Sequence, residues 1–399
     1  MDTPYWLQEE IPRRPQPRHD GHVDVAIVGA GVTGCSAALR LAEAGVRVRV
    51  HESRRVAEGA SGRNGGFALT GGATLYDVAR DTYGREEACE LWRWTERALE
   101  RMFVLGGDSL RRTGSYRLAT DEEEREQIRR EYDALREDGF DAEWLDEVPG
   151  PVGGLFLGAV HHPHDATIQP ARFVRRLAAH AAEAGADIRE HDEVADVDAL
   201  DADHVVVATD GYGHGLVPEL ADLIWPARGQ MIACEPLDRV LFDRPHYARQ
   251  GFDYWQQLAD GRVLLGGFRD VSIMDELTDV EETTPAIQAS LEQFLGELIG
   301  RPPQITHRWA GIFGLTQDLL PLAGRVPGLE APPAEPATPG GETPTPSASV
   351  GRGRIWVAAG YSGHGNIPGF ACGELVADAI LGDVSSPQLE LLDPARFSG

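Results

Sequence analysis

The stretch VDVAIVGAGVTGCSAALRLAEAGVRVRVHE, residues 23–52, constrains the fold more than any other part of the chain. Its apolar run at 23–28 predicts a buried strand, residues 32–44 have the spacing of a helix, and residues 46–51 predict a second strand. A strand, a helix and a strand in this order, with a glycine-rich turn after the first strand, are typical of a βαβ unit in a parallel sheet. The sequence therefore predicts an α/β fold.

The glycines of this turn follow the pattern Gly-x-Gly-x-x-Gly, as Gly29, Gly31 and Gly34. The first permits a tight turn, the second lets a pyrophosphate approach the backbone, and the third lets the helix pack closely on the strand. Val32 and Thr33 then begin the helix, whose unpaired N–H groups and partial positive charge favour a phosphate. The turn predicts a dinucleotide-binding site.

Glu52 closes the second strand, where an acidic side chain can bind the hydroxyl groups of a ribose, and Ser53 follows it. These residues alone leave the identity of the dinucleotide open. A nicotinamide that binds and leaves would make the chain one kind of dehydrogenase, whereas a flavin that stays bound would make it another kind of oxidoreductase.

The composition argues against several classes of partner and chemistry. A formal net charge of −27 argues against nucleic acid or an anionic membrane surface. All 37 basic residues are arginines, which excludes a Schiff-base lysine, a pyridoxal-phosphate anchor and a Walker A lysine. The chain has no apolar run of about 18 residues and no apolar core of a signal peptide near its start, so we expect a cytoplasmic protein without a membrane span.

Cysteine and histidine spacing favours neither a disulfide framework nor a metal site. Cys35, Cys89, Cys234 and Cys372 lie far apart and form no CxxC pair, so we expect four reduced thiols. The histidines of HHPHD, residues 161–165, match no standard zinc pattern, and we expect no metal.

Periodicity predicts the other elements. Helices are expected at 86–105, 120–139, 169–188 and 282–300, and strands at 115–120, 203–211 and, as an antiparallel pair, within 253–270. In the helix at 120–139, Asp121 and the glutamates after it suit the positive N-terminal end. Residues 1–21 read as an extended arm, and the low-complexity stretch 330–353 predicts a disordered surface loop.

Two further glycine-rich motifs suit a cofactor site. In GASGRNGGFAL, residues 59–69, an arginine can neutralise phosphate, an asparagine can hydrogen-bond a heterocycle, and two glycines let the backbone come close. The alternative is a flexible glycine loop. The residues of this motif expected to contact the cofactor are Ser61, Arg63, Asn64, Gly65, Gly66 and Phe67.

The motif AAGYSGHGNIPG, residues 358–369, follows a strand and opens a helix with Gly360, Gly363 and Gly365. The positive end of that helix, with His364 beside it, would stabilise the negative charge of a reduced flavin. The alternative is a glycine turn with a surface histidine.

Together the motifs resemble one family. The segments VAIVGAGVTGCSAALRLAEAG, GASGRNGGF, VVVATDGY, PARGQM, DGRVLLGGFRD, RWAGIFGLTQDLLPLAGR and AAGYSGHG occur in this order. They are similar to the D-amino-acid oxidase family, which includes glycine oxidase, sarcosine oxidase and gamma-glutamylputrescine oxidase. The likeness covers roughly residues 4–385.

The resemblance implies bound FAD, with its isoalloxazine between the loop at 61–67 and the helix that follows the turn at 360–365. It implies contacts from Val194 near the adenine and from Ala208, Thr209 and Gly311. Some members attach FAD to a cysteine and place a lysine over it. Because AGIFGLT has no cysteine and the chain has no lysine, we expect noncovalent FAD, and reaction with oxygen is not implied.

The resemblance also implies an architecture. It predicts a glutathione-reductase-type FAD domain formed by residues 22–90, 150–216 and 305–385. A substrate domain with an antiparallel sheet would comprise residues 91–149 and 217–304.

The implied reaction is oxidation of a C–N bond in a small amine or amino acid. Hydride transfer to flavin N5 gives an imine that water hydrolyses, and no general base is obligatory. Tyr254 and Gln256 share one strand face, Arg269 could pair with a carboxylate, and His364 could orient substrate or flavin, whereas Trp309 is expected to pack. The electron acceptor is oxygen or a carrier, and a flavin-binding protein without turnover is the alternative from another class.

Overall fold

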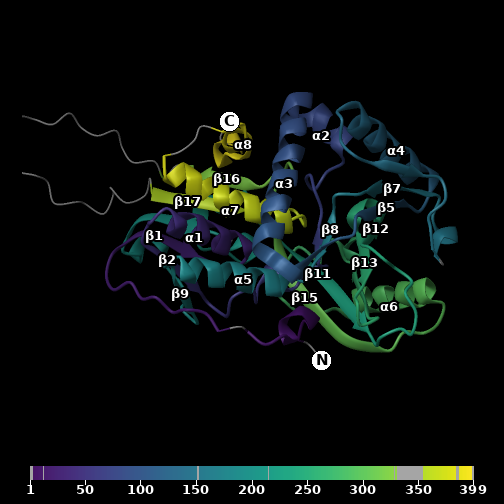
Figure 1. Ribbon diagram of the computed structural model, residues 1–399, viewed down its shortest axis with the longest axis horizontal. Helices are drawn as coiled ribbons and strands as arrows, with labels where there is room; N and C mark the ends of the chain where they lie inside the picture. Colours follow the sequence, from purple (N-terminus) through teal and green to yellow (C-terminus); the bar gives the residue numbers. More distant parts are fainter. Residues whose placement is uncertain are drawn as a thin grey trace, which may run out of the picture.

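The computed structural model describes residues 3–11, 13–150, 152–213, 215–327, 329, 354–382 and 386–397. It is a mixed α/β fold with one mainly parallel sheet, one mainly antiparallel sheet and a small third sheet (Figure 1). The expected fold class is therefore confirmed. The expected loop at 330–353 lies outside the described residues.

The mainly parallel sheet has the strand order β16-β17-β10-β1-β2-β9. Five of these strands run parallel, and β16 is antiparallel to β17. Every residue of β17 is buried, which explains its continuous apolar sequence, IWVAA. The strands are β1 (Val23–Val28), β2 (Val48–Glu52), β9 (Asp187–Glu190), β10 (Ala202–Val207), β16 (Leu322–Arg325) and β17 (Ile355–Ala359).

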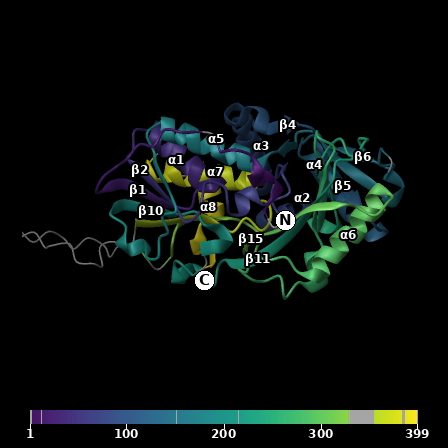
Figure 2. The ribbon, with the colours of Figure 1, turned by 90° about the horizontal axis from the view of Figure 1, so that it is seen from below.

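Three helices that are far apart in the sequence pack together on one face of this sheet, α1 (Val32–Glu43), α5 (Pro170–Glu183) and α7 (Asn366–Ile380) (Figure 2). Small residues bring α1 and α7 close: a Cβ on Gly373 would lie 2.1 Å from Ser36 Oγ. The N-terminal and C-terminal segments of the chain therefore form one packed layer.

The second sheet has the order β15-β11-β14-β13-β12-β5-β7-β6 and is antiparallel except where β12 meets β5. Helix α6 (Pro285–Ile299) packs beside its long strands (Figures 1 and 2). Its strands are β5 (Ser115–Ala119), β6 (Glu143–Leu145), β7 (Gly158–His162), β11 (Trp225–Cys234), β12 (His246–Ala248), β13 (Asp253–Gln257), β14 (Val263–Gly267) and β15 (Ile305–Leu315).

The remaining elements surround the junction of the two sheets. Asp121 caps α4 through its Oδ1, which accepts the N–H of Glu124 at 2.8 Å, so the expected role of this residue is confirmed. The elements are β3 (Phe67–Ala68), β4 (Leu110–Arg112), β8 (Ala166–Ile168), α2 (Tyr76–Tyr83), α3 (Arg85–Gly106), α4 (Glu122–Glu137) and α8 (Pro387–Leu392).

The second sheet, which has eight strands and is here named the large sheet, crosses the expected domain boundaries. Strands β7 and β15 fall in segments that the resemblance assigned to the FAD domain, yet both pair with strands of the large sheet. The two-domain division stays a prediction, and the six strands of the mainly parallel sheet all come from the segments expected to form the FAD domain.

The N-terminal arm differs from its expected form. Residues Tyr5–Gln8 form a short 3-10 helix, η1, in which Trp6 is 2% exposed.

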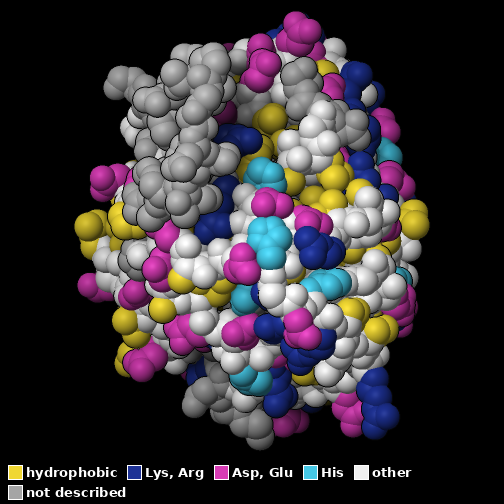
Figure 3. Space-filling model, turned by 90° about the vertical axis from the view of Figure 1, so that its left-hand side faces the viewer, with side chains coloured by type: hydrophobic (Ala, Val, Ile, Leu, Met, Phe, Trp, Pro, Cys, Tyr) yellow, Lys and Arg dark blue, Asp and Glu magenta, His cyan; other side chains and the backbone are white. Residues whose placement is uncertain are grey.

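No helix in the described part of the chain has the length and apolar character needed to cross a membrane. On the face shown in Figure 3, acidic and basic side chains are interspersed and do not form a continuous basic patch.

Candidate active site

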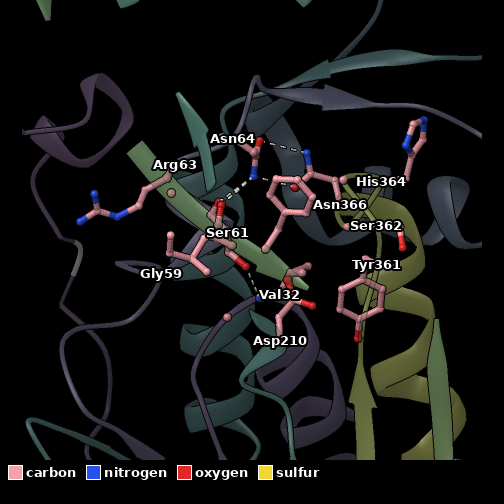
Figure 4. Close-up of a pocket in the computed structure, with 18 of the residues that line it drawn as sticks. Val32, Gly59, Ser61, Arg63, Asn64, Asp210, Tyr361, Ser362, His364 and Asn366 are labelled. Atoms are coloured by element: carbon pink, nitrogen blue, oxygen red, sulfur yellow. Dashed lines mark hydrogen bonds between the residues drawn. The ribbon is translucent and has the colours of Figure 1, made fainter. Parts of the chain in front are cut away.

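A single elongated cavity of about 1100 Å³ connects the glycine-rich turns near the two ends of the chain. Its wall includes Gly31 and Val32 from the first turn and Gly363 and Gly365 from the last. In Figure 4, Ser61 and Asn64 lie on one side of the cavity, and Tyr361 and Ser362 from the C-terminal segment lie on the other.

Most of the residues expected to bind cofactor or substrate line this cavity. They are Gly29, Gly31, Val32, Thr33, Glu52, Ser53, Ser61, Arg63, Asn64, Gly65, Phe67, Val194, Ala208, Thr209, Tyr254, Arg269, Gly311, Gly363, His364 and Gly365. Gly34, Gly66, Gly360 and Gln256 do not line it.

The first glycine turn is built by close backbone contacts. Gly29 has φ +102°, a conformation that side chains rarely adopt. A Cβ on Gly34 would lie 1.9 Å from the carbonyl oxygen of Gly29, so Gly34 serves helix packing and not direct contact with a ligand. The N-cap of α1 is Gly31, which has no side chain of its own to accept an N–H of the first turn. The positive end of α1 therefore opens on the cavity.

Glu52 and Ser61 hold the turn from either side. The carboxylate of Glu52 accepts the N–H groups of Ala30 and Arg54, each at 2.8 Å. Ser61 Oγ accepts the N–H of Val32 at 2.9 Å (Figure 4). These contacts fix the backbone where the sequence predicts a pyrophosphate.

The asparagine of the second motif joins two distant segments. Asn64 Oδ1 accepts the N–H of Gly66 at 2.9 Å, and the side-chain amides of Asn64 and Asn366 are hydrogen-bonded to each other at 3.1 Å (Figure 4). Asn366 also donates to the carbonyl of Phe67 at 2.7 Å. The loop is thereby fixed to the first turn of α7 and is not a free glycine loop.

Gln256 holds the loop of the second motif, residues 59–69, through hydrogen bonds to its backbone. It is 1% exposed, and its Nε2 donates to the carbonyls of Gly65 and Gly66. A Cβ on Gly66 would lie 2.5 Å from the same nitrogen. Gln256 and Gly66 are therefore packed behind the cavity wall, because the loop covers the strand face that Gln256 shares with Tyr254.

The third motif is fixed by Asp210, which sequence reasoning missed. Its two carboxylate oxygens accept the N–H groups of Gly360 at 2.8 Å and Gly314 at 3.0 Å. Burial raises the pKa of Asp210, while these N–H groups lower it. A Cβ on Gly360 would lie 2.5 Å from Thr316 Cγ2, so Gly360 is packed away from the cavity. The position of Asp210 three residues after the end of β10, at Val207, was the available signal.

One hydrogen bond joins the two glycine-rich turns directly. Tyr361 OH and Thr33 Oγ1 are 2.8 Å apart in the buried interface of α1 and α7. Burial raises the pKa of Tyr361, so its phenol stays neutral. The convergence of the two turns, on which the expected cofactor site depends, is thus present in the fold.

Two cavity arginines share one acid. Arg63 and Arg54 pair with Glu281 Oε1 at 2.9 and 3.1 Å, and Tyr212 OH donates to the same carboxylate. Arg63 also donates to the carbonyl of Ala310 at 3.0 Å. Arg63 therefore already has an acidic partner, which sequence reasoning did not anticipate.

Arg269 lies in a different electrostatic setting. The arginines that line the cavity are Arg54, Arg63, Arg117, Arg130 and Arg269. Within the described residues, the first four have acidic partners (Glu281, Glu281, Glu131 and Asp77) and Arg269 has none within ion-pair distance. Its guanidinium lies over the rings of Phe252 and Phe313 at 5.2 and 5.7 Å, and burial lowers its pKa.

Aromatic side chains complete this end of the cavity. The rings of Phe67 and Tyr254 meet edge to face, 6.0 Å apart. Burial raises the pKa of Tyr254 to about 12 and lowers that of His364 to about 4. Both groups are therefore uncharged near neutral pH.

Two tryptophans and two histidines of residues 161–164 make hydrogen bonds to the surrounding protein. Trp309 is 1% exposed and donates to the carbonyl of Arg63 at 2.8 Å, so its expected packing role is confirmed. Trp6, which the sequence did not single out, donates to the carbonyl of Asn64 at 2.7 Å. In the histidine cluster, His161 contacts Glu143 and His164 contacts Asp141.

The wall of the cavity fits a dinucleotide such as FAD. The N-terminus of α1, where Ser61 accepts the N–H of Val32, offers its other N–H groups to a phosphate, and a Cβ at Gly31 would lie 2.9 Å from Ser61 Oγ. Thr209 Oγ1 is buried without a hydrogen-bond partner in the described part of the chain. All four cysteines are described and none lines the cavity.

Comparison with known proteins identifies the family. The family model described as DAO, FAD dependent oxidoreductase, matches residues 24–379. The chain belongs to the DAO family. It is thus an FAD-dependent oxidoreductase, which resolves the choice between a flavin and a nicotinamide alone.

Individual members of the family align along most of the chain. Gamma-glutamylputrescine oxidoreductase of Escherichia coli (strain K12) is 29% identical, over 90% of this chain and 84% of that protein. A probable oxidoreductase, OrdL, of Rhizobium meliloti (strain 1021) is 27% identical, over 98% of this chain and 91% of that protein.

Solved structures share the fold. Glycine oxidase from Geobacillus kaustophilus superposes with a TM-score of 0.73 at 21% identity, covering 95% of this chain and all of that one. L-Proline dehydrogenase from P. horikoshii superposes with a TM-score of 0.72 at 20% identity, covering 96% of this chain and 98% of that one.

Proposed function

We propose that this DAO-family protein oxidises the C–N bond of a small amino acid, or of an amine that carries a carboxylate. Noncovalent FAD would lie along the cavity, with its pyrophosphate at Gly31–Thr33 and its ring system between the loop at 61–67 and the turn at 361–365. Bound FAD supplies the two-electron acceptor for the hydride of the C–H bond beside nitrogen.

Arg269 is the observation that carries this proposal. It is half-buried in the cavity wall, and no described acidic side chain lies within ion-pair distance of it. A half-buried guanidinium without an acidic partner is a favourable place for an anion, and a substrate carboxylate could bind it through two parallel hydrogen bonds. Such a contact would fix the position of the carboxylate and so direct the adjacent C–H bond.

The surrounding side chains orient the substrate without transferring a proton. Tyr254 keeps its phenolic proton, since its pKa is about 12, and can donate a hydrogen bond to the carboxylate. The rings of Phe252 and Phe313 limit the water around Arg269. The product imine hydrolyses after oxidation, and that step needs no group of the protein.

An Arg269→Gln variant tests the proposal. Losing hydrogen bonds to a charged group costs about 1.5–3 kcal/mol, so the Kd of a carboxylate substrate should rise about 10- to 100-fold. The measurement is anaerobic bleaching of the flavin band by a panel of amino acids and by the corresponding amines without the carboxylate.

Arg130→Gln is the matched control, because Arg130 also lines the cavity but pairs with Asp77 at 3.6 Å and has a side chain that is 60% exposed. Its affinity for the same substrates should change much less. If no amino acid or amine bleached the wild-type flavin, the chain would be a flavin-binding protein without turnover, and the proposal would fail.

A dehydrogenase that passes electrons to a carrier is the second candidate. The absence of lysine from the whole sequence favours it over an oxidase, because the chain has no ammonium to stabilise reduced oxygen species. Reoxidation of the reduced flavin by air within seconds would favour the oxidase, whereas slow reoxidation by air with fast reduction of an added dye would favour the dehydrogenase.

A further inference from the structure

The outer part of the cavity is enclosed by four segments that bond to one another. Arg130 on α4 pairs with Asp77 on α2 at 3.6 Å, and Gln250 donates to Gln127 on α4 at 3.1 Å. Tyr83 at the end of α2 donates to the carbonyl of Asp318 at 2.8 Å. We call this enclosure, residues 69–78, 127–130, 247–254 and 315–319, the outer wall.

No acidic side chain of the outer wall lines the cavity, although Asp77, Asp253 and Asp318 belong to its segments. The acidic residues that line the cavity are Glu52, Asp192, Glu193 and Asp210, and none of them belongs to the outer wall. Glu52 binds the first glycine turn, Asp192 contacts His51, and Asp210 binds the N–H groups of Gly314 and Gly360. The arginines at the outer end of the cavity are Arg117, Arg130 and Arg269.

One side of the outer wall is apolar. Leucine, alanine and valine side chains from the segment before α2, from α2 itself and from the end of β15 line it, and Val78 is 44% exposed. The apolar members are Leu69, Ala73, Leu75, Val78, Leu315 and Leu319. This surface would contact the part of a substrate that lies beyond its carboxylate and its reacting nitrogen.

We infer that the substrate has an apolar side chain and no second ammonium group. The inference rests on the proposed function. A distal ammonium would lose water against apolar side chains, near the guanidinium of Arg269 and with no acidic side chain lining the outer wall, so the cavity would reject it. The same charge distribution favours the neutral form of the reacting amine, which hydride transfer requires.

Binding of two unreactive carboxylates tests the inference apart from turnover. Hexanoate and 6-aminohexanoate have the same chain length and differ in the terminal ammonium. Added to the FAD-loaded enzyme, hexanoate should perturb the flavin spectrum with a Kd about 10- to 100-fold lower than that of 6-aminohexanoate. Equal or reversed affinities would overturn the inference.

Racemic norleucine and racemic lysine make the corresponding substrate pair. Norleucine should bleach the flavin anaerobically with at least about tenfold higher kcat/KM than lysine. If hexanoate bound selectively but neither amino acid bleached the flavin, the proposed function would fail while the inference about the cavity held. If lysine reacted as well as norleucine, the inference alone would fail.

A Val78→Asp variant should weaken the preference by placing a carboxylate in the lining of the outer wall. We expect the affinity ratio of hexanoate to 6-aminohexanoate to fall at least about tenfold. Val104→Asp is the control, because Val104 is 83% exposed on α3 and does not line the cavity. A ratio that both variants left unchanged would contradict the role of the outer wall.

Discussion

Gly34 shows how one hydrogen atom in place of a side chain can decide whether the cofactor site forms. A Cβ there would lie 1.9 Å from the carbonyl oxygen of Gly29, and backbone on both sides prevents relaxation. We expect Gly34→Ala to lose most of its bound FAD and to unfold at lower temperature. The measurement is the ratio of flavin to protein after purification, together with Tm.

Gly154→Ala provides the comparison, since a Cβ at Gly154 would meet nothing within 4 Å. It should keep the flavin content of the wild-type protein. Full flavin content in Gly34→Ala would mean that α1 does not need its close approach to β1.

His364 makes stability depend on pH with a definite sign. Burial lowers its pKa to about 4 from the ordinary 6.5. Between these values the unfolded chain binds the proton more strongly, so the stability contribution is complete above pH 6.5 and is lost as the pH falls toward 4. We expect His364→Gln to reduce the loss of unfolding free energy between about pH 7 and pH 5 by about 2 kcal/mol.

Urea unfolding of the FAD-loaded protein at the two pH values measures this difference. The same loss in the variant and the wild-type protein would show that His364 binds its proton equally well in both states.

At the scale of elements, the position of η1 against the cofactor site depends on one indole, that of Trp6. Trp6 is 2% exposed and donates to the carbonyl of Asn64 at 2.7 Å, which couples the N-terminal segment to the loop of the second motif. Trp6→Phe should weaken FAD binding about fivefold, as expected for the loss of about 1 kcal/mol. Trp225→Phe is the matched control, because Trp225 is 42% exposed.

Fluorescence titration of the apoprotein with FAD gives both dissociation constants. Equal values for the two variants would mean that η1 packs against the site without stabilising it.

The same elements show what the sequence could and could not predict. The strand expected at 23–28 is β1, Val23–Val28, because its continuous apolar run is a local signal. Alternation placed Tyr254 and Gln256 on one strand face. It could not show that the loop at 65–66 would cover that face at Gln256 and leave Tyr254 in the cavity, since such contacts join residues about 190 apart.

The sequence alone also could not show which arginines have acidic partners. Arg63 and Arg269 both looked like candidates for an anion, but the partner of Arg63, Glu281, comes from a distant segment. Only the fold shows that Arg63 is paired and that Arg269 has no acidic partner among the described residues. The motifs thus predicted the place of the site, whereas the electrostatics that select a substrate needed the tertiary structure.

At the scale of the whole molecule, the two ends of the chain form one site. Helices α1 and α7 pack through Gly369 and Gly373, and Tyr361 OH in the turn before α7 lies 2.8 Å from Thr33 Oγ1 in the first turn of α1. The large sheet then places Tyr254 and Arg269 at the other end of the same cavity. Cofactor binding should therefore depend on residues from both termini.

A crystal structure of the protein with FAD and hexanoate tests the account most directly. We expect the pyrophosphate at Gly31–Thr33, the isoalloxazine between the loop at 61–67 and the turn at 361–365, and the hexanoate carboxylate on Arg269. A flavin bound elsewhere, or a carboxylate that leaves Arg269 without a partner, would contradict it.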